Sequence, residues 1–245
     1  MKKLIIAAAA ALAFASVANA QTNLQTFYDL GRGYATTTLE GFYGDNWGNT
    51  FFFFDHYYST KADRDDLGAA SAINGSYFEI ERCLNFWQDT KLGGLSAMVE
   101  YDGATWGAGI FCFGANYFLH SKDFKNTFNL ALLYDCHVGY GDADTPIKFS
   151  GVWGCQDIFG VSGLRFSGFI DIWGNNQVCT PKDGGILDAE ETHFSILTEP
   201  QLWYNVGKLF GVDNLNIGGE IELSYNFAGR LGFMCNPAIG AKWVF

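Results

Sequence analysis

Apolar and polar side chains alternate with a period of two along most of this sequence. Within residues 127–140, for example, Leu132 and Tyr134 share one face, whereas Asp135 and His137 share the other. This period is typical of a β-strand, because successive side chains of a strand point to opposite faces. The pattern predicts a series of amphipathic strands separated by turn residues. The twelve expected spans are 24–31, 36–43, 50–58, 76–87, 95–102, 106–119, 127–140, 146–155, 163–173, 192–204, 214–227 and 232–245.

Two folds accommodate amphipathic strands in this number. A soluble sandwich buries the apolar face, whereas a membrane barrel turns that face to lipid and encloses the polar one. Several predicted strands exceed ten residues, which suits a tilted membrane-crossing strand better than the usual strand of about 5–6 residues. Aromatic residues at strand ends, such as Tyr43 and Tyr204, are typical of membrane interfaces. We therefore predict an all-β fold, a transmembrane antiparallel up-and-down β-barrel of twelve strands with both termini periplasmic.

The N-terminal segment has the features of an export signal. Two lysines precede an apolar run that ends near Val17, and an Ala-Asn-Ala sequence ends at Ala20. A basic start, a short apolar stretch and small residues at the cleavage point are typical of a signal peptide. We expect a cleaved signal peptide at 1–20 and a single outer-membrane barrel domain at 21–245.

The C-terminal segment resembles the assembly signal of bacterial outer-membrane barrels. Ile239, Ala241, Trp243 and Phe245 alternate with Gly, Lys and Val, and the sequence ends on an aromatic residue. The resemblance implies a location in the bacterial outer membrane, contact with its lipid, and recognition of this strand by the barrel-assembly machinery. The two longest predicted connections, 59–75 and 174–191, follow the third and ninth strands. Both would be extracellular if the first strand runs outward, as the long loops of such barrels are.

The cost of placing charge in lipid predicts which face of each strand lines the lumen. An Arg or Lys on the lipid face near the midplane costs about 2–4 kcal/mol, and an acid somewhat less. The acidic side chains on the polar parity should therefore face inward, with Lys148, Arg165 and Lys242 as the few basic companions. Arg82 falls on the apolar parity, so either a β-bulge re-aims it or it extends to an interface. The predicted inward acids are Asp29, Glu40, Asp55, Glu79, Glu81, Glu100, Asp102, Asp135, Asp171, Glu199, Glu220 and Glu222.

The composition of this lumen favours neutral or cationic solutes over anions. Pores for anions are lined by Arg and Lys, which are scarce here. Carboxylates accept hydrogen bonds from hydroxyl and amino groups, and aromatic faces stack on planar bases. A nucleoside would satisfy both, although the same residues could merely fill a narrow barrel. The inward aromatic residues are predicted to be Phe53, Tyr57, Trp87, Phe169, Trp173 and Trp203.

Three segments resemble the opening strands of the Tsx-like nucleoside-specific outer-membrane channels. They are Thr37-Thr-Leu-Glu-Gly-Phe-Tyr-Gly-Asp-Asn-Trp47, Phe51-Phe-Phe-Phe-Asp-His56 and Tyr77-Phe-Glu-Ile-Glu-Arg82, and the Gly114-Ala-Asn-Tyr-Phe118 strand and the Trp-Val-Phe end are similar too. The resemblance implies a monomeric twelve-stranded barrel whose narrow lumen passes nucleosides. It also implies that Glu40, Asp55 and Glu79 are lumenal acids. The predicted channel-lining set is Glu40, Asp55, Glu79, Glu81, Glu100, Asp135, Phe169, Asp171, Trp173, Glu199, Trp203, Glu220 and Glu222.

Two other functional classes stay open. An outer-membrane hydrolase would need a Ser, a His and an orienting group together on the lipid-facing wall. His56 has the outward parity, but no Gly-x-Ser motif lies near it. A structural or adhesive barrel would have a plugged lumen. We predict a channel rather than an enzyme, with no catalytic residue, cofactor or metal, and no nucleic-acid partner because the sequence is acidic, with a formal net charge of −11.

The six cysteines carry no metal-binding spacing. Disulfides can form in the oxidising envelope, and the adjacent strands of Cys136 and Cys155 make one bond between them conceivable. A cysteine that faces lipid also behaves as a small apolar residue. We expect mostly free thiols.

Overall fold

The computed structural model describes residues 20–58, 73–105, 109–138, 143–182 and 184–245. Apart from Ala20, the predicted signal peptide lies outside these residues, as does most of the loop predicted at 59–75. No helix among the described residues is long and apolar enough to cross a membrane. The described chain consists almost entirely of strands, with three short 3-10 helices at Ile158–Gly160, Ile186–Asp188 and Val206–Phe210.

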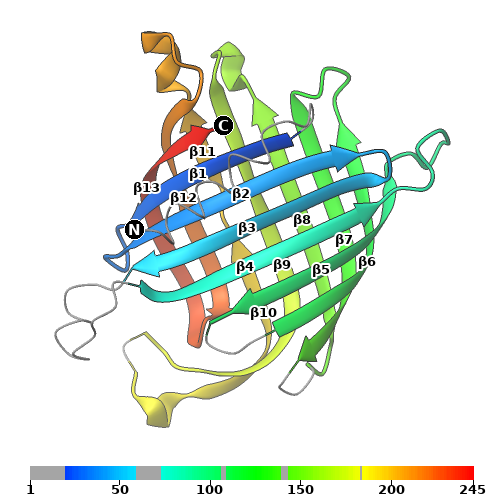
Figure 1. Cartoon of the computed structure of the whole chain (residues 1–245). Coiled ribbons are helices and arrows are strands. Elements are labelled where there is room, and N and C mark those ends of the chain that lie inside the picture. Colours follow the sequence, from blue (N-terminus) through cyan, green and yellow to red (C-terminus); the bar gives the residue numbers. More distant parts are fainter. Residues whose placement is uncertain (1–19, 59–72, 106–108, 139–142, 183) are drawn as a thin grey trace, which may run out of the picture.

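The strands follow one another in an up-and-down order (Figure 1). Their bounds are β1 Ala20–Asp29, β2 Ala35–Asp45, β3 Gly48–Tyr58, β4 Ile73–Leu84, β5 Leu95–Ala104, β6 Gly109–His120, β7 Asn126–Val138, β8 Ile147–Gln156, β9 Leu164–Cys179, β10 Glu190–Thr198, β11 Gln201–Tyr204, β12 Leu215–Phe227 and β13 Arg230–Val244.

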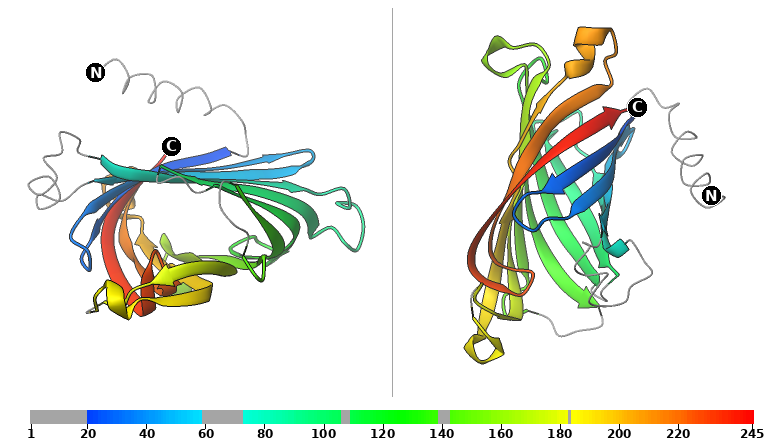
Figure 2. Two further views of the ribbon diagram at one scale, coloured as in Figure 1. Left: turned by 90° about the horizontal axis from the view of Figure 1, so that it is seen from below. Right: turned by 90° about the vertical axis from the view of Figure 1, so that its left-hand side faces the viewer.

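The sheet closes on itself. Each strand pairs antiparallel with its neighbours, and β1 pairs with β13 from Asn23 opposite Val244 to Asp29 opposite Ala238. β10 and β11 both lie between β9 and β12, so they are two parts of one strand. The result is a closed barrel of twelve antiparallel strands, which confirms the predicted fold class. Figure 2 shows the strands enclosing a common interior.

Pro200 explains the interruption between β10 and β11. Proline has no backbone N–H and cannot donate to a ladder. The flanking hydrogen bonds nevertheless continue the pairing, because Glu199 N donates to Phe169 O at 3.1 Å and Ile221 N donates to Pro200 O at 3.1 Å. The interrupted strand therefore still seals the wall between its neighbours.

Loop lengths are more even than the sequence analysis predicted. β9 continues to Cys179, six residues past its predicted end at residue 173 (179 − 173 = 6), so the predicted connection 174–191 shrinks to 180–189. At the end that carries both chain termini, the connections 85–94 and 205–214 are equally long. Loop length therefore supports the expected orientation less strongly, and the direction of the barrel in a membrane stays a prediction.

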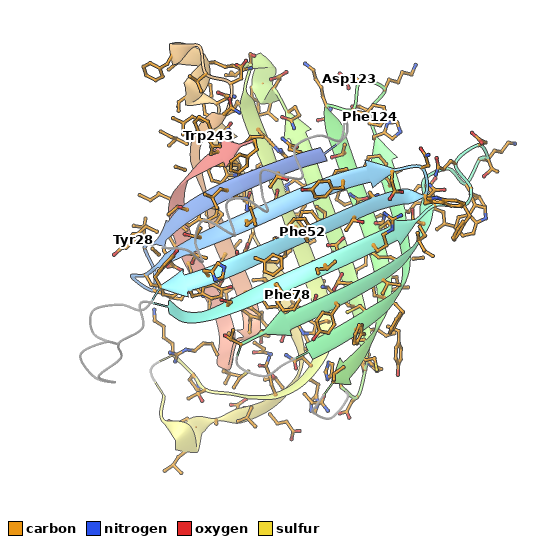
Figure 3. All side chains as sticks on the ribbon, in the orientation of Figure 1. Tyr28, Phe52, Phe78, Asp123, Phe124 and Trp243 are labelled. Atoms are coloured by element: carbon orange, nitrogen blue, oxygen red, sulfur yellow. The ribbon has the colours of Figure 1, made fainter. Side chains whose placement is uncertain are left out.

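The outer surface of the barrel is apolar. Leu132 is 61% exposed and Ile239 is 59% exposed, and both lie on the outward register. Figure 3 shows Tyr28, Phe52 and Phe78 on the outer face of the strands nearest the viewer. Neighbouring outward rings pack together, as in the stacked pair Phe54–Phe78 with centroids 5.3 Å apart. An apolar exterior around a polar interior is the arrangement of a membrane barrel and not of a soluble sandwich.

Arg82 faces outward without a bulge. It lies opposite Thr50 in a stretch where the pairing of β3 with β4 is regular. Its guanidinium forms an ion pair with Asp45 at 2.8 Å and donates to Thr50 Oγ1 at 3.1 Å. Asp45 ends β2 beside a two-residue turn, so this pair lies at the rim of the barrel. Of the two predicted explanations, extension to an interface is the one that fits.

All six cysteines are free thiols. The bond considered between Cys136 and Cys155 is wrong, because the antiparallel register of β7 and β8 sets Cys155 opposite Asn126. Asn126 begins β7, whereas Cys136 lies near its other end. Cys112 and Cys83 are instead buried together with Met98 and Leu133.

Candidate functional site: the acidic barrel interior

The register places the predicted channel-lining set on the inner wall, including Glu199, which lies between β10 and β11 and pairs with Phe169. One row of cross-strand neighbours runs from Glu40 through Phe53 and Glu79 to Asp102. A second runs from Glu81 through Glu100 and Cys112 to Asp135. The remaining lining residues follow the same parity on β3 and from β9 to β12, namely Asp55, Phe169, Asp171, Trp173, Glu199, Trp203, Glu220 and Glu222. Their contact with a solute stays a prediction.

Ion pairs that cross the barrel show which face is the interior. Lys148 on β8 lies 2.6 Å from Glu100 on β5, and two strands separate these residues in the wall. Only side chains that point into the barrel can meet in this way. The same Nζ lies 3.4 Å from Asp171 and 4.0 Å from Asp102. The ammonium group therefore ties three strands together through the interior.

Lys148 stands within an unusually acidic set of side chains. We call this set the Lys148 cluster, and its members are Lys148, Glu79, Glu81, Glu100, Asp102, Asp135 and Asp171. The six acids and one lysine have a formal charge of −6 + 1 = −5. Glu100 and Asp135 are each only 1% exposed, and Tyr77 donates to Glu79 Oε2 at 3.2 Å. Such burial makes each unpaired charge costly, which favours a cationic guest.

A second set of inward side chains surrounds an indole ring. Trp203 is 1% exposed and packs on Phe27 with ring centroids 5.6 Å apart. The Lys242 ammonium lies 4.4 Å from the centre of the indole ring, a cation–π contact. Trp203 Nε1 donates to Gln201, which in turn donates to Glu220, both at 2.9 Å. We call Phe27, Gln201, Trp203, Glu220 and Lys242 the Trp203 cluster.

The predicted acids Glu40 and Asp55 are held by neighbouring hydrogen bonds. Asn23 donates to Glu40 at 2.8 Å, and Thr38 donates to Asp55 at 2.5 Å. Tyr57 adds a second donor to Asp55 at 3.3 Å. Both carboxylates therefore keep defined positions on the inner wall.

A third polar group lies at the end of the barrel away from the termini. Arg32, in the connection after β1, forms ion pairs with Asp29 at 2.6 Å and Glu222 at 2.7 Å. Asn236 donates to the other oxygen of Glu222 at 2.9 Å. A cavity of about 280 Å³ opens here, with Phe227 among its lining residues. Arg32 is not predicted from the sequence, because strand parity applies only within strands and Arg32 lies in a connection.

The interior is densely filled. Gln25, Glu100, Asp135 and Trp203 reach only about 1% exposure although they carry long or bulky side chains. Two of them reach across the barrel, because Glu100 on β5 pairs with Lys148 on β8 and Trp203 on β11 packs on Phe27 on β1. Any path through this barrel is therefore narrow.

One predicted aromatic residue is not part of the inner wall. β4 ends at Leu84, and Trp87 lies beyond it in the connection to β5, packed edge-on against Phe86. Asn85 Oδ1 accepts from Trp87 N at 2.9 Å and helps to form this turn. The prediction that Trp87 lines the lumen is wrong because alternation stops where the strand stops.

The structure also shows a partner for His56 that the sequence analysis did not identify. His56 Nδ1 and Ser76 Oγ lie 2.9 Å apart on the outer face of β3 and β4, where the two residues are direct cross-strand neighbours. Ser76 N donates to Thr105 Oγ1 at 2.9 Å. A Ser–His pair on the lipid-facing wall is thus present, and strand register was the signal that could have found it.

Several solved structures resemble this chain. A NanC porin structure is 11% identical, with coverage of 91% of this chain and 98% of the porin, and a TM-score of 0.54. Outer membrane phospholipase A from Escherichia coli is 10% identical, with coverage of 92% and 96% and a TM-score of 0.50. The COG4313 outer membrane channel from Pseudomonas putida F1 is 11% identical, with coverage of 94% and 97% and a TM-score of 0.46.

At such identities the likeness to the porin and the phospholipase shows the fold alone, that of an outer-membrane β-barrel. No curated protein matches the sequence. One family does, and its match extends over residues 20–245, the entire barrel. The chain therefore belongs to the family described as a domain of unknown function, DUF5020.

Proposed function

We propose that this protein is a narrow diffusion channel of the outer membrane and that nucleosides are its best substrate class. The observation that carries the proposal is the chemistry of the interior. Carboxylates such as Glu40, Asp55 and Glu79 stand on the inner wall beside the rings of Phe53 and Tyr77. Phe53 and Tyr77 have their centroids 5.6 Å apart.

These two kinds of group suit the two parts of a nucleoside. Carboxylate oxygens accept hydrogen bonds from ribose hydroxyls and exocyclic amino groups, and aromatic faces stack on a base with about 1–3 kcal/mol per base. The resemblance of short motifs to the Tsx-like channels favours the same substrate class. A phosphate group would meet the acidic wall unfavourably, so nucleotides should be excluded. We further propose a monomer with both termini in the periplasm, inserted by the barrel-assembly machinery through its C-terminal strand.

Titration of a nucleoside into a planar bilayer that holds the refolded barrel tests the substrate class. We expect adenosine or thymidine to reduce the single-channel current at sub-millimolar concentration, whereas glucose and inorganic phosphate leave it unchanged. Glu40→Gln, Asp55→Asn and Glu79→Gln should each weaken the block. A matched control is Glu190→Gln, because Glu190 is an exposed residue at the start of β10. A steady current that no nucleoside alters would reject nucleosides as the substrate class.

The dense packing of the interior favours a second candidate, a structural barrel that transports nothing. The Lys148 ion pairs and the buried Trp203 would then serve as a permanent plug. A liposome swelling assay distinguishes the two functions. Liposomes that contain a channel swell in an isotonic solution of a permeant nucleoside, whereas liposomes that contain a plugged barrel do not.

The His56–Ser76 contact favours a third candidate, a hydrolase acting on lipid. A complete site would also need a group to orient the imidazole and donors for the oxyanion. Ser76 N is already committed to Thr105 and is not free for that role. Purified barrel should therefore release no fatty acid from phospholipid micelles. Release that disappears in Ser76→Ala would instead establish the enzyme.

A further inference from the structure

Three carboxylates of the Lys148 cluster converge at one point inside the barrel. Glu79 and Glu81 point inward from β4, and Glu100 lies directly opposite Glu81 on β5. One oxygen of each of the three lies within 4.8 Å of the others. Like charges so close together repel strongly in a partly dehydrated interior, so the arrangement calls for a positive partner.

Lys148 supplies only part of that charge. Its short contacts are with Glu100 at 2.6 Å and Asp171 at 3.4 Å. It contributes a single positive charge to a set of six acids. A second cation of higher charge would reduce the remaining repulsion around Glu79 and Glu81.

An independent observation comes from acids next to these three. Asp135 is 1% exposed and Asp102 is 8% exposed. Among the described residues, neither Asp135 Oδ1 nor Asp102 Oδ1 has a hydrogen-bond partner. Asp102 lies within 4.8 Å of Glu100 and Cys112, and Asp135 is the cross-strand neighbour of Cys112. Buried carboxylate oxygens without a donor are costly, and a cation bound beside them at Glu100 would offset that cost.

We propose that Glu79, Glu81 and Glu100 bind a divalent cation of the oxygen-preferring class, with Ca²⁺ as the best fit. Ca²⁺ takes oxygen ligands at about 2.3–2.6 Å, so two oxygens on opposite sides of one ion are separated by up to roughly 5 Å. The three carboxylate oxygens, which lie within 4.8 Å of one another, fit that span. Asp102 and Asp135 would hold water molecules of the bound ion through their unpaired oxygens.

This inference goes beyond solute transport, because a bound ion needs no flux through the barrel. The proposed site also predicts the order in which metal ions bind, from the tightest to the weakest. A site made of three carboxylates favours Ca²⁺, which accepts varied oxygen geometries, over Mg²⁺, which demands near-ideal octahedral geometry and gives up its water reluctantly. Carboxylate oxygens without imidazole ligands are also a poor site for Zn²⁺ or Cu²⁺.

Calorimetric titration tests the site directly. The refolded full-length barrel in nonionic detergent is treated with EDTA, desalted, and titrated at pH 7.5 with CaCl₂ and separately with MgCl₂. We expect one saturable Ca²⁺ per barrel, with a dissociation constant of about 10⁻⁴ to 10⁻³ M or lower, and weaker Mg²⁺ binding. Terbium(III) offers a second readout, because Tyr77 donates to Glu79 and can sensitise its luminescence.

Two variants locate the ion. Glu81→Gln should weaken Ca²⁺ binding at least tenfold, and Glu79→Gln serves the same purpose if Glu81→Gln fails to fold. Glu220→Gln is the matched control, since Glu220 is also an inward glutamate but belongs to the Trp203 cluster. Folding of each variant is checked by its heat-dependent shift in gel migration.

Two results would overturn the site: no saturable Ca²⁺ binding by the wild type, or equal binding by Glu81→Gln and Glu220→Gln. Because no conductance is measured, a failed titration leaves the channel proposal intact. Equally, a barrel that binds Ca²⁺ but passes no solute keeps this inference and rejects the channel.

Discussion

Replacement of Lys148 by methionine tests whether the interior depends on this one cation. The Nζ atom lies 2.6, 3.4 and 4.0 Å from carboxylate oxygens of Glu100, Asp171 and Asp102. Lys148 is only 7% exposed. Lys148→Met keeps an unbranched side chain only one atom shorter and removes the charge, so packing changes little while three acids lose their partner.

The loss of stability depends on whether one of the acids that no longer has Lys148 as a partner takes up a proton. Removal of one partner of a buried ion pair destabilises by about 3–5 kcal/mol. Uptake of a proton by one of the acids limits this loss, and for an ordinary glutamate that uptake costs about 3.7 kcal/mol at pH 7 and about 1 kcal/mol at pH 5. We therefore expect Lys148→Met to lower the free energy of unfolding by about 3–4 kcal/mol at pH 7 and by distinctly less at pH 5.

Urea unfolding of the barrel in lipid vesicles, followed by tryptophan fluorescence, measures this loss at both pH values. The control is Lys125→Met, because Lys125 pairs with Asp157 at 2.8 Å between two exposed turns and should contribute nothing measurable. The double variant Lys148→Met/Glu100→Gln should recover part of the stability, since it also removes one of the repelling charges.

A loss that is the same at pH 7 and pH 5 would refute this reasoning. It would mean that Lys148 stabilises by packing and that its charge is already screened by water in the interior. A double variant less stable than Lys148→Met alone would lead to the same conclusion.

Two further predictions follow from the interior packing and from the outward cysteines. Trp203→Ala removes the indole between Phe27 and Lys242; it should raise single-channel conductance and cost about 3–5 kcal/mol of stability, and an unchanged conductance would show that the narrow point lies elsewhere. In single-cysteine variants, the exposed Cys136 and Cys235 should react with N-phenylmaleimide in detergent, whereas the fully buried Cys112 should react only after unfolding. Equal rates at all three positions would contradict the assigned faces.

The sequence predicts which side chains of each strand point inward, because a shift of one residue would move every side chain of that strand to the opposite face. Glu220 and Glu222 alternate with apolar residues along β12, and only one register keeps both out of lipid. The same parity argument found Asp171 and Trp173 on β9. Twelve strands, their order and their inward acids were therefore accessible without a structure.

Features that depend on contacts between distant parts of the chain were not accessible. The pairing of β12 with β13 shifts between Tyr225 and Phe227. The ring of Phe227 packs on that of the inward Trp173, with ring centroids 5.9 Å apart. Simple alternation would have placed Phe227 outside with Tyr225. The partners of Lys148 lie two strands away in the wall, and no local pattern encodes which strands face one another across a barrel.

Residues at the ends of the barrel could not be placed from the sequence either, because their positions depend on contacts between distant parts of the chain. Arg32 and Trp87 both lie in connections, where the period of two no longer applies. Arg32 joins the interior through Asp29 and Glu222, whereas Trp87 leaves it. The extension of β9 to Cys179 arises because β10 pairs with it out to Glu190.

We propose above that a narrow, acidic path crosses this barrel. Single-channel recording of the refolded protein in a planar bilayer, with a KCl gradient across it, tests this proposal. We expect a small, stable conductance and a reversal potential that shows preference for K⁺ over Cl⁻, because carboxylates dominate the inner wall. Absence of any conductance, or a preference for Cl⁻, would contradict it.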